Sequence, residues 1–390
     1  MEIIRTNKYR LYPNSKQKSL LHNHFGQVRF VFNSVLGMIQ ECKFGSYVNK
    51  KGVTYGSIPS QTVLINQITE LKNKYPFLYQ TGNDFLQAEL NNLYLGTKGF
   101  LKGIYGYPKF KSRKNKEQSI NLRAGSRAKF DSEYVYLPVP MGTQFDKSDF
   151  KIKYKKHRTN YSLPEKITSY TISKDNLDRY WISFTFKIEL NYKIKGTKGL
   201  NKQCGIDLGI KDLIITSDGL KIPNDNLIKK SELKLTFLQR RLSKKKNGSK
   251  NRNKARLKVA KCQDKIKNKR QYRNHNITRS LVNIYDFIGV ETLAVKNMIK
   301  NKSLSKSIAN VSWFDIVSKI EYKMTEKQGH LIKIDQFYPS SKTCSNCGSV
   351  KQKIPLEIRI YECSECSYIE DRDINAAKNI LAEAKRIADI

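Results

Sequence analysis

Four cysteines in the last quarter of the sequence have the spacing of metal ligands. Cys344 and Cys347 form one Cys-x-x-Cys pair, Cys363 and Cys366 form a second, and fifteen residues separate the two pairs. This spacing is typical of a four-thiolate zinc ribbon. A tetrahedral site closed by four thiolates is structural rather than catalytic, because no ligand position stays open. The alternatives are four unligated thiols or two disulfides, and both are disfavoured because paired thiolates in a reducing compartment bind zinc strongly.

The residues that follow the two pairs differ. Gly348 follows the first pair and can adopt the positive φ that a knuckle turn requires, whereas Ser367 follows the second pair, where that angle costs more. We therefore expect a second knuckle that is slightly strained but complete in its ligands.

Acidic residues in two apolar segments form a second set of candidate ligands. Asp207 lies in the middle of the strand-like segment 204–210, and Glu291 ends the segment 284–291. A buried carboxylate must be hydrogen-bonded, protonated or bound to a cation. Sheets of α/β proteins place their ligands beyond the carboxyl ends of the strands. Taken singly, each acid is more simply explained as a capped or ion-paired carboxylate.

A third acidic candidate opens the last helix that the sequence predicts. Asp371 and Asp373 both lie at its start, and either would be a good N-cap with no catalytic role. Two strand carboxylates and one helix carboxylate could nevertheless converge on Mg²⁺, which takes oxygen ligands. Such a site suits phosphodiester hydrolysis by two ions about 3.5–4 Å apart. No Walker loop or dinucleotide fingerprint competes for this role.

The net charge of the chain indicates its class of partner. The 390 residues include 73 Lys and Arg but only 34 Asp and Glu, which gives a formal net charge of +39. This excess favours a polyanionic partner, with nucleic acid the leading candidate. A hydrophobic content of 39% argues against a disordered basic tail. The mean hydropathy of −0.59 and the absence of a long apolar run predict no membrane helix and no secretion.

Three regions of different character must position these residues. Residues 15–104 show the three- and four-residue apolar spacing of amphipathic helices. Residues 105–198 alternate like antiparallel strands, with Tyr180, Ile182 and Phe184 on one face, and the strand before Pro13 could belong to the same sheet. From residue 199, strands at 203–210, 212–217, 284–291 and 331–337 alternate with helices near 313–329 and from 373, which predicts an α/β domain.

The segment 229–273 concentrates the positive charge. It holds 19 Lys or Arg and two acidic residues, with an intermittent stripe of leucines and an Asn247-Gly248 turn that predicts a helical hairpin. A solvated hairpin whose charges merely avoid the core is one interpretation. The excess of charge favours a surface that follows a phosphate backbone.

Several sequence motifs, in their order along the chain, resemble those of the TnpB family of transposon-encoded, RNA-guided nucleases. These nucleases are related to compact type V CRISPR effectors. The similar runs are 205–212, 289–298, 338–348 and 363–380, with weaker similarity at 9–13, 25–29 and 107–111. Two departures are Ser367, where the family has Gly, and Glu362, where an aromatic residue is common. Neither departure touches an acidic candidate.

The resemblance implies a multidomain α+β and α/β fold. Residues 1–14 and 105–198 would form a β-barrel, and residues 15–104 a helical recognition domain inserted into it. Residues 199–340 and 367–390 would form an RNase H-like (RuvC) nuclease domain, interrupted by a zinc ribbon at 341–366.

The resemblance also implies an RNA-guided endonuclease that cleaves double-stranded DNA with two metal ions. Asp207 and Glu291 match the first two catalytic carboxylates and Asp373 matches the third, so these residues would bind Mg²⁺ while the four cysteines bind structural Zn²⁺. The partners would be a guide RNA, with scaffold and guide segments, and the target DNA, in the nucleoid-containing cytoplasm of a prokaryotic-type cell. Alternatives are a guided DNA-binding repressor that no longer cuts, a compact type V CRISPR effector, and a transposase using the same carboxylates.

Overall fold

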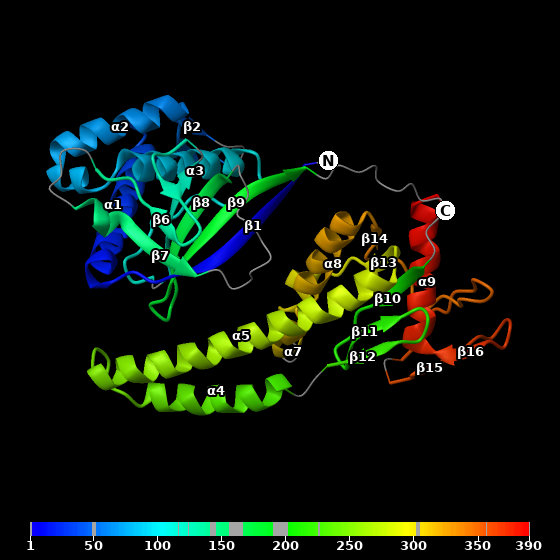
Figure 1. The fold of residues 1–390 in the computed structure, drawn as a ribbon. Helices are drawn as coiled ribbons and strands as arrows, with labels where there is room; N and C mark the ends of the chain where they lie inside the picture. The colour runs from blue at the N-terminus through cyan, green and yellow to red at the C-terminus, as the bar shows by residue number, and fades with distance from the viewer. Residues whose placement is uncertain are drawn as a thin grey trace. The chain divides into compact units, whose positions relative to one another are not determined.

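The chain folds into two compact units, Met1–Leu190 and Asn191–Ile390 (Figure 1). The computed structural model describes residues 2–48, 52–115, 117–123, 125–140, 146–155, 167–189, 202–224, 227–301, 305–355 and 357–389. The domain boundary expected at residues 198 and 199 lies outside these ranges.

The first unit combines helices with a large antiparallel sheet. Its helices are α1 (Ser15–Gln40), α2 (Gln61–Lys74), η1 (Pro76–Gln80), α3 (Asn83–Leu101) and η2 (Lys147–Phe150). Its strands are β1 (Glu2–Leu11), β2 (Ser46–Val48), β3 (Thr54–Gly56), β4 (Gln118–Arg123), β5 (Lys129–Phe130), β6 (Tyr134–Tyr136), β7 (Lys151–Lys155), β8 (Ile167–Lys174) and β9 (Tyr180–Glu189).

The large sheet has the strand order β4-β8-β9-β1-β7-β6-β5, while β2 and β3 form a separate hairpin. Within the described residues the order is linear, and the edge strands β4 and β5 do not pair with each other. The described strands therefore form an open sheet, and closure into the expected barrel is not seen among them.

The first strand and the last strand of this unit pair directly. β1 and β9 are antiparallel over ten residue pairs, from Glu2 with Glu189 to Leu11 with Tyr180. Ile182 and Phe184 of β9 are buried, as the alternating pattern predicts, and belong to one core with residues of α1 and α3. The expectation that the initial strand joins this sheet, with helices inserted between, is confirmed.

The second unit contains a five-stranded sheet, the basic helical hairpin and the cysteine cluster. Its strands are β10 (Gln203–Asp207), β11 (Asp212–Thr216), β12 (Lys221–Pro223), β13 (Phe287–Glu291), β14 (His330–Ile334), β15 (Ile360–Glu362) and β16 (Ile369–Asp371). Its helices are α4 (Leu227–Ser243), α5 (Lys250–Ile284), α6 (Val295–Met298), α7 (Ser305–Val311), α8 (Trp313–Lys327) and α9 (Arg372–Ile387).

The five strands have the order β12-β11-β10-β13-β14. β10, β13 and β14 run parallel to one another, whereas β11 is antiparallel to both β10 and β12. Two sequence expectations are corrected here. Asp207 ends β10 rather than lying in its middle, and residue 284 ends helix α5 rather than starting a strand, because α5 continues its helical pattern up to a cap at Tyr285.

The two faces of the sheet carry different helices. Ile206 and Val290 belong to the core that contains Leu281 of α5 and Ile316 of α8. Their neighbours along the strands, Gly205 and Gly289, face the other way, toward α9. The sheet is therefore covered by α5 and α8 on one face and by α9 on the other.

The basic segment forms the predicted hairpin of α4 and α5, with Gly248 at a φ of +79° in the turn. Leu235 and Leu238 pack on Cys262 and Ile266 and hold the two helices together. In the picture the turn end of the hairpin extends away from the sheet (Figure 1).

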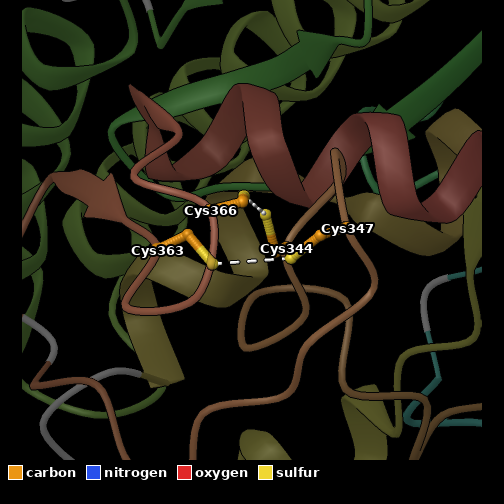
Figure 2. Close-up of side chains that lie close together, drawn as sticks. All are labelled: Cys344, Cys347, Cys363 and Cys366. Carbon is orange, nitrogen blue, oxygen red and sulfur yellow. Dashed lines mark hydrogen bonds between the residues drawn. The ribbon is translucent and has the colours of Figure 1, made fainter.

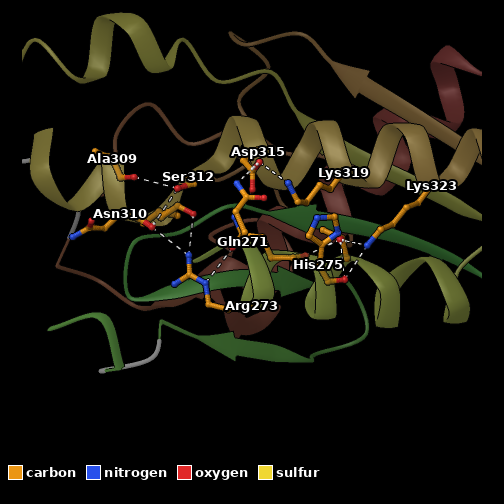
Figure 3. A network of polar contacts seen from close by, with 12 residues as sticks. Gln271, Arg273, His275, Ala309, Asn310, Ser312, Asp315, Lys319 and Lys323 are labelled. Carbon is orange, nitrogen blue, oxygen red and sulfur yellow. Dashed lines mark hydrogen bonds and ion pairs between the residues drawn. The ribbon is translucent and has the colours of Figure 1, made fainter. Parts of the chain in front are cut away.

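A polar network fastens the other half of α5 to α8 (Figure 3). The carboxylate of Asp315 accepts from Lys319 Nζ at 2.6 Å, from Asn274 Nδ2 at 2.7 Å and from Gln271 Nε2 at 3.2 Å. Lys323 Nζ donates to the carbonyl of His275 at 2.8 Å. These bonds anchor the long basic helix in the second unit.

Among the described helices, none has the length and apolarity of a membrane span.

Helix α9 lies unusually close to the sheet because two strand positions are glycines. A Cβ on Gly205 would lie 1.9 Å from the carbonyl oxygen of Ala377, and a Cβ on Gly289 would lie 2.6 Å from the Cβ of Ala384. No side chain fits at these separations unless the helix moves. The glycines therefore set the distance between α9 and the strand ends.

We predict that Gly205→Ala lowers the stability of the protein, since displacing packed backbone costs about 1–3 kcal/mol or more. The loss would appear as a lower transition temperature in scanning calorimetry. Gly106→Ala is the matched control, because a Cβ there meets nothing within 4 Å. Equal melting of the two variants would contradict the close approach.

Candidate functional site

Three acidic residues come together at one edge of the five-stranded sheet. Asp207 ends β10 and Glu291 ends the adjacent parallel strand β13. In the parallel register Gly205 lies opposite Gly289 and Ile206 opposite Val290. Asp207 and Glu291 are the next residues of the two strands, so they lie side by side. Both acids share the face of the two glycines, which is the face that α9 covers.

The start of α9 separates the roles of its two aspartates. Asp371 is the N-cap, and its carboxylate accepts from the backbone N–H of Asp373 at 3.1 Å and of Ile374 at 3.2 Å. Its second oxygen pairs with Lys221 Nζ at 2.6 Å. Asp373 is therefore not needed as the cap. Its carboxylate lies 3.6 Å from the guanidinium of the exposed Arg359 and stays available to a ligand.

The electrostatics of the three acids are coupled. Burial, together with the negative charges of Glu291 and Asp373, raises the pKa of Asp207 to about 8. Burial also raises the pKa of Glu291, and a hydrogen bond from Ser340 Oγ at 2.8 Å partly opposes that rise. In the described part of the chain, no Lys or Arg forms an ion pair with Asp207 or Glu291.

These features fit a site for cations. Asp207 and Glu291 are half-buried acids without an ion-pair partner among the described residues, and a bound cation would supply positive charge that stabilises their ionised forms. The three carboxylates are more widely spread than the four thiols, which are the one group in the described residues whose ligand atoms all lie within 4.8 Å.

Several polar residues that support this edge were not assigned from the sequence. Asn375 Nδ2 donates to the carbonyl of Thr343 at 2.8 Å, and Asn379 Nδ2 donates to the carbonyl of Ser340 at 2.8 Å. Both amides are buried on α9, four residues apart. The signal was present in the sequence, because two asparagines on the apolar face of a helix need buried partners.

The side chains of the four cysteines lie close together (Figure 2). The Sγ atoms of Cys344 and Cys366 are 3.7 Å apart, and those of Cys347 and Cys363 are 3.6 Å apart. A tetrahedral zinc ion with bonds of about 2.3 Å separates its sulfurs by about 3.8 Å. The four sulfurs are thus arranged as ligands of a single metal ion such as zinc.

The two halves of the cluster repeat one backbone pattern. The N–H of Gly348 bonds to the carbonyl of Cys344, and the N–H of Ser367 bonds to the carbonyl of Cys363. Gly348 has a φ of +78° and Ser367 a φ of +54°, so the expected strain of the second knuckle is confirmed. A hydrogen bond with the Ser349 hydroxyl, at 3.2 Å, contributes most to lowering the pKa of Cys363 to about 6. A low pKa favours the thiolate that metals bind.

We predict that Ser367→Gly stabilises the second knuckle, because a residue with a Cβ pays about 1–2 kcal/mol for the left-handed conformation. The variant would melt at a higher temperature than the parent in zinc-containing buffer and release metal to a chelator more slowly. The reciprocal change Gly348→Ala is expected to act in the opposite direction. A Ser367→Gly variant that loses metal faster would show that the serine has another role.

Three family models match successive parts of the chain. A model described as "Helix-turn-helix domain" matches residues 1–42, which the structure folds as β1 and α1. A model described as "Probable transposase" matches residues 186–302. A model described as "Cas12f1-like, TNB domain" matches residues 313–380, which contain the cysteine cluster and the start of α9.

Relatives extend the similarity to nearly the whole chain. A protein of Streptomyces pristinaespiralis described as "Putative RNA-guided DNA endonuclease" is 32% identical over 383 residues, covering 98% of this chain and 89% of the relative. "TnpB-like protein L79" of Acanthamoeba polyphaga mimivirus is 22% identical, covering 97% of this chain and 73% of the relative.

A solved structure shares the fold. The Cas12f1 chain of a cryo-EM structure titled as a complex of Cas12f1, sgRNA and target DNA is 14% identical, with a TM-score of 0.53 over 97% of this chain and 98% of that one. Together with the motifs and the identity over almost the full length of the Streptomyces relative, these similarities show that the chain belongs to the TnpB family.

Proposed function

We propose that this chain is an RNA-guided DNA endonuclease associated with a transposon. The observation that carries the proposal is the convergence of Asp207, Glu291 and Asp373 at one sheet edge in a chain whose full-length relative is described as such an endonuclease. The match to a family described as "Probable transposase" supports the link to a mobile element. An enzyme of this kind would act on the DNA of the nucleoid, in the cytoplasm.

The second unit is best interpreted as an RNase H-like nuclease domain of the RuvC type. Its sheet has three parallel strands with an antiparallel pair at one side, and its candidate acids lie at strand ends and at a helix start. We infer that the nuclease domain comprises residues 199–340 and 367–390, with the zinc ribbon at 341–366. The first unit would supply a barrel-like sheet domain, 1–14 and 105–198, and the helical insert 15–104.

Asp207, Glu291 and Asp373 would hold two Mg²⁺ ions, and Cys344, Cys347, Cys363 and Cys366 would hold Zn²⁺. Bound Mg²⁺ would activate the attacking water and stabilise the leaving oxygen of the phosphodiester.

The chain itself contributes position and environment at the acids. Ser340 orients Glu291 through its hydrogen bond, and Asp371 caps α9 so that the carboxylate of Asp373 is not used for capping. Partial burial of Asp207 lowers the local dielectric, which would strengthen its interaction with positive charge.

The partners proposed are a guide RNA, with scaffold and guide segments, and double-stranded target DNA. The α4–α5 hairpin, with its 19 basic and two acidic residues between positions 229 and 273, would follow the phosphate backbone of one of them. The hydrogen bonds around Asp315 anchor α5 to α8, which would keep this charged surface at a fixed position relative to the three candidate catalytic acids. Sequence choice would come from base pairing with the guide.

We predict that Asp373→Ala and Asp371→Ala separate catalysis from folding. Asp373→Ala is expected to abolish cleavage of a guided DNA substrate with little change in melting temperature, because its carboxylate does not cap the helix. Asp371→Ala removes the cap and the Lys221 pair, so it should lower stability by about 0.5–2 kcal/mol yet still cut below its melting temperature. If Asp373→Ala lowered stability and Asp371→Ala abolished cleavage, Asp371 would be the catalytic residue and Asp373 the cap.

We also predict that Asp207→Ala abolishes cleavage while binding of RNA and DNA is retained. The measurement is a Mg²⁺ titration of the guide-loaded protein on cognate DNA, with a gel-shift assay for binding. Full cleavage by the variant would overturn the assignment of Asp207. Binding without cleavage by the parent protein would favour a guided repressor, and joined products would favour a transposase.

Guidance itself is tested by sequencing the RNA that co-purifies with the protein. A discrete RNA with a constant scaffold and a variable end is expected. A random collection of cellular fragments would leave an endonuclease without a guide.

A further inference from the structure

A cleft of about 760 Å³ opens on the surface of the first unit, between helix α1, the η1 helix and the segment that follows residue 110. On α1 the lining positions 22, 26, 29 and 33 recur at spacings of three and four, so they form one face of the helix. A volume of this size is typical of small-ligand sites. No carboxylate is among the residues that line it.

The cleft is lined by basic side chains that lack a partner among the described residues. Burial and the neighbouring charge of Arg113 lower the pKa of Arg29, and burial together with Lys174, Arg113 and Arg29 lowers that of His22. In the described residues neither arginine side chain has an ion pair or a hydrogen bond. A crowded, unpaired pair of guanidinium groups is a site for an anion, and phosphate suits their planar donors.

The segment that carries Arg113 is held in place. The side-chain amide of Asn33 bonds the backbone of Lys111 twice, donating to its carbonyl at 2.9 Å and accepting from its N–H at 2.8 Å. Lys111 Nζ also pairs with the buried carboxylate of Glu89. Since Lys111 is fixed to both α1 and α3, Arg113 is set two residues further on at the wall of the cleft.

The cleft is also lined by an aromatic ring and an amide. Phe77 packs edge-on against Phe30 with ring centroids 5.3 Å apart, yet its side chain stays 43% exposed. Gln27 is only 6% exposed, and its Oε1 is buried without a hydrogen-bond partner. A buried acceptor of this kind lacks a donor that a ligand would supply. Gly26 leaves room beside Arg29, since a Cβ there would lie 3.9 Å from Nη2.

We propose that this cleft binds one unstacked nucleotide of a single-stranded nucleic acid, with the base on Phe77 and the phosphate on Arg29 and Arg113. Stacking on an exposed ring is tolerant of sequence, and Gln27 Oε1 would accept from an amino or imino N–H of the base. The inference rests on the nucleic-acid binding proposed above but not on cleavage. The nucleotide could be part of the guide RNA or of a displaced DNA strand, and the two sources share this chemistry.

The test is photo-crosslinking of the full chain, loaded with its RNA and bound to target DNA. One arm carries 4-thiouridine in the RNA and the other carries 4-thiothymidine in the DNA, and mass spectrometry locates the adducts. Adducts on Phe30, Phe77 or His22 are expected in one arm, which identifies the strand. Adducts confined to other surfaces, such as the α4–α5 hairpin, in both arms would overturn the proposal.

Matched variants give a second readout. Phe77→Leu is expected to reduce the cleft adduct at least about 5-fold, the effect of losing one stacked base. Arg29→Gln combined with Arg113→Gln should reduce it likewise. The controls are Phe110→Leu, which removes an exposed ring outside the cleft, and Lys18→Gln, which removes an exposed charge from the same helix. Variants no different from these controls would overturn the cleft assignment.

Cleavage is scored separately in the same samples. A complex that forms cleft adducts but never cuts DNA would overturn the proposed nuclease and leave the cleft intact. A complex that cuts DNA without cleft adducts in either arm would overturn the cleft proposal and leave the proposed nuclease intact.

Discussion

The close approach of helix α9 to strands β10 and β13 is the constraint on which the second unit depends. At Gly205 and Gly289 the strands carry no side chain, so the helix rests almost on their backbone. The acids at the ends of these strands share the same face. Their mutual repulsion and burial, visible in the raised pKa of Asp207, work against folding. Packing of α9 against the sheet must offset that repulsion, so the site depends on a helix held close by glycine.

One loop connects the candidate acidic site to the cysteine cluster. Between Ser340 and Cys344 the chain passes from the hydrogen bond on Glu291 to the first cysteine of the cluster. The side-chain amides of Asn375 and Asn379 on α9 donate hydrogen bonds to backbone carbonyls of this loop. A metal bound by the cysteines would thus stiffen the loop that orients a candidate catalytic acid. With a metal bound, the cluster would support the site by restraining its neighbours.

Sequence reasoning reached the parts of this structure that depend on local pattern. The cysteine spacing, the alternation in β9 and the Asn-Gly turn of the basic hairpin depend on neighbouring residues, and each prediction agrees with the structure. Local pattern alone could not choose between Asp371 and Asp373, because both are good caps. In the structure Asp371 is the cap, and its other oxygen pairs with Lys221, 150 residues away along the chain. Sequence reasoning extended a strand into α5 because an apolar segment fits either periodicity. The cleft beside Phe77 is assembled from three separate segments and leaves no linear signature.

The pairing of β1 with β9 has a consequence for how the protein is made. Glu2 finds its partner only at Glu189, so the first strand leaves the ribosome long before the strand that completes its ladder. At about 5–20 residues per second, synthesis of the intervening chain takes about 10–40 s. During that interval β1 would present an unpaired edge, while the inserted helices α1 to α3 can form from local contacts. Biosynthesis would thus complete the helical insert before the sheet that frames it.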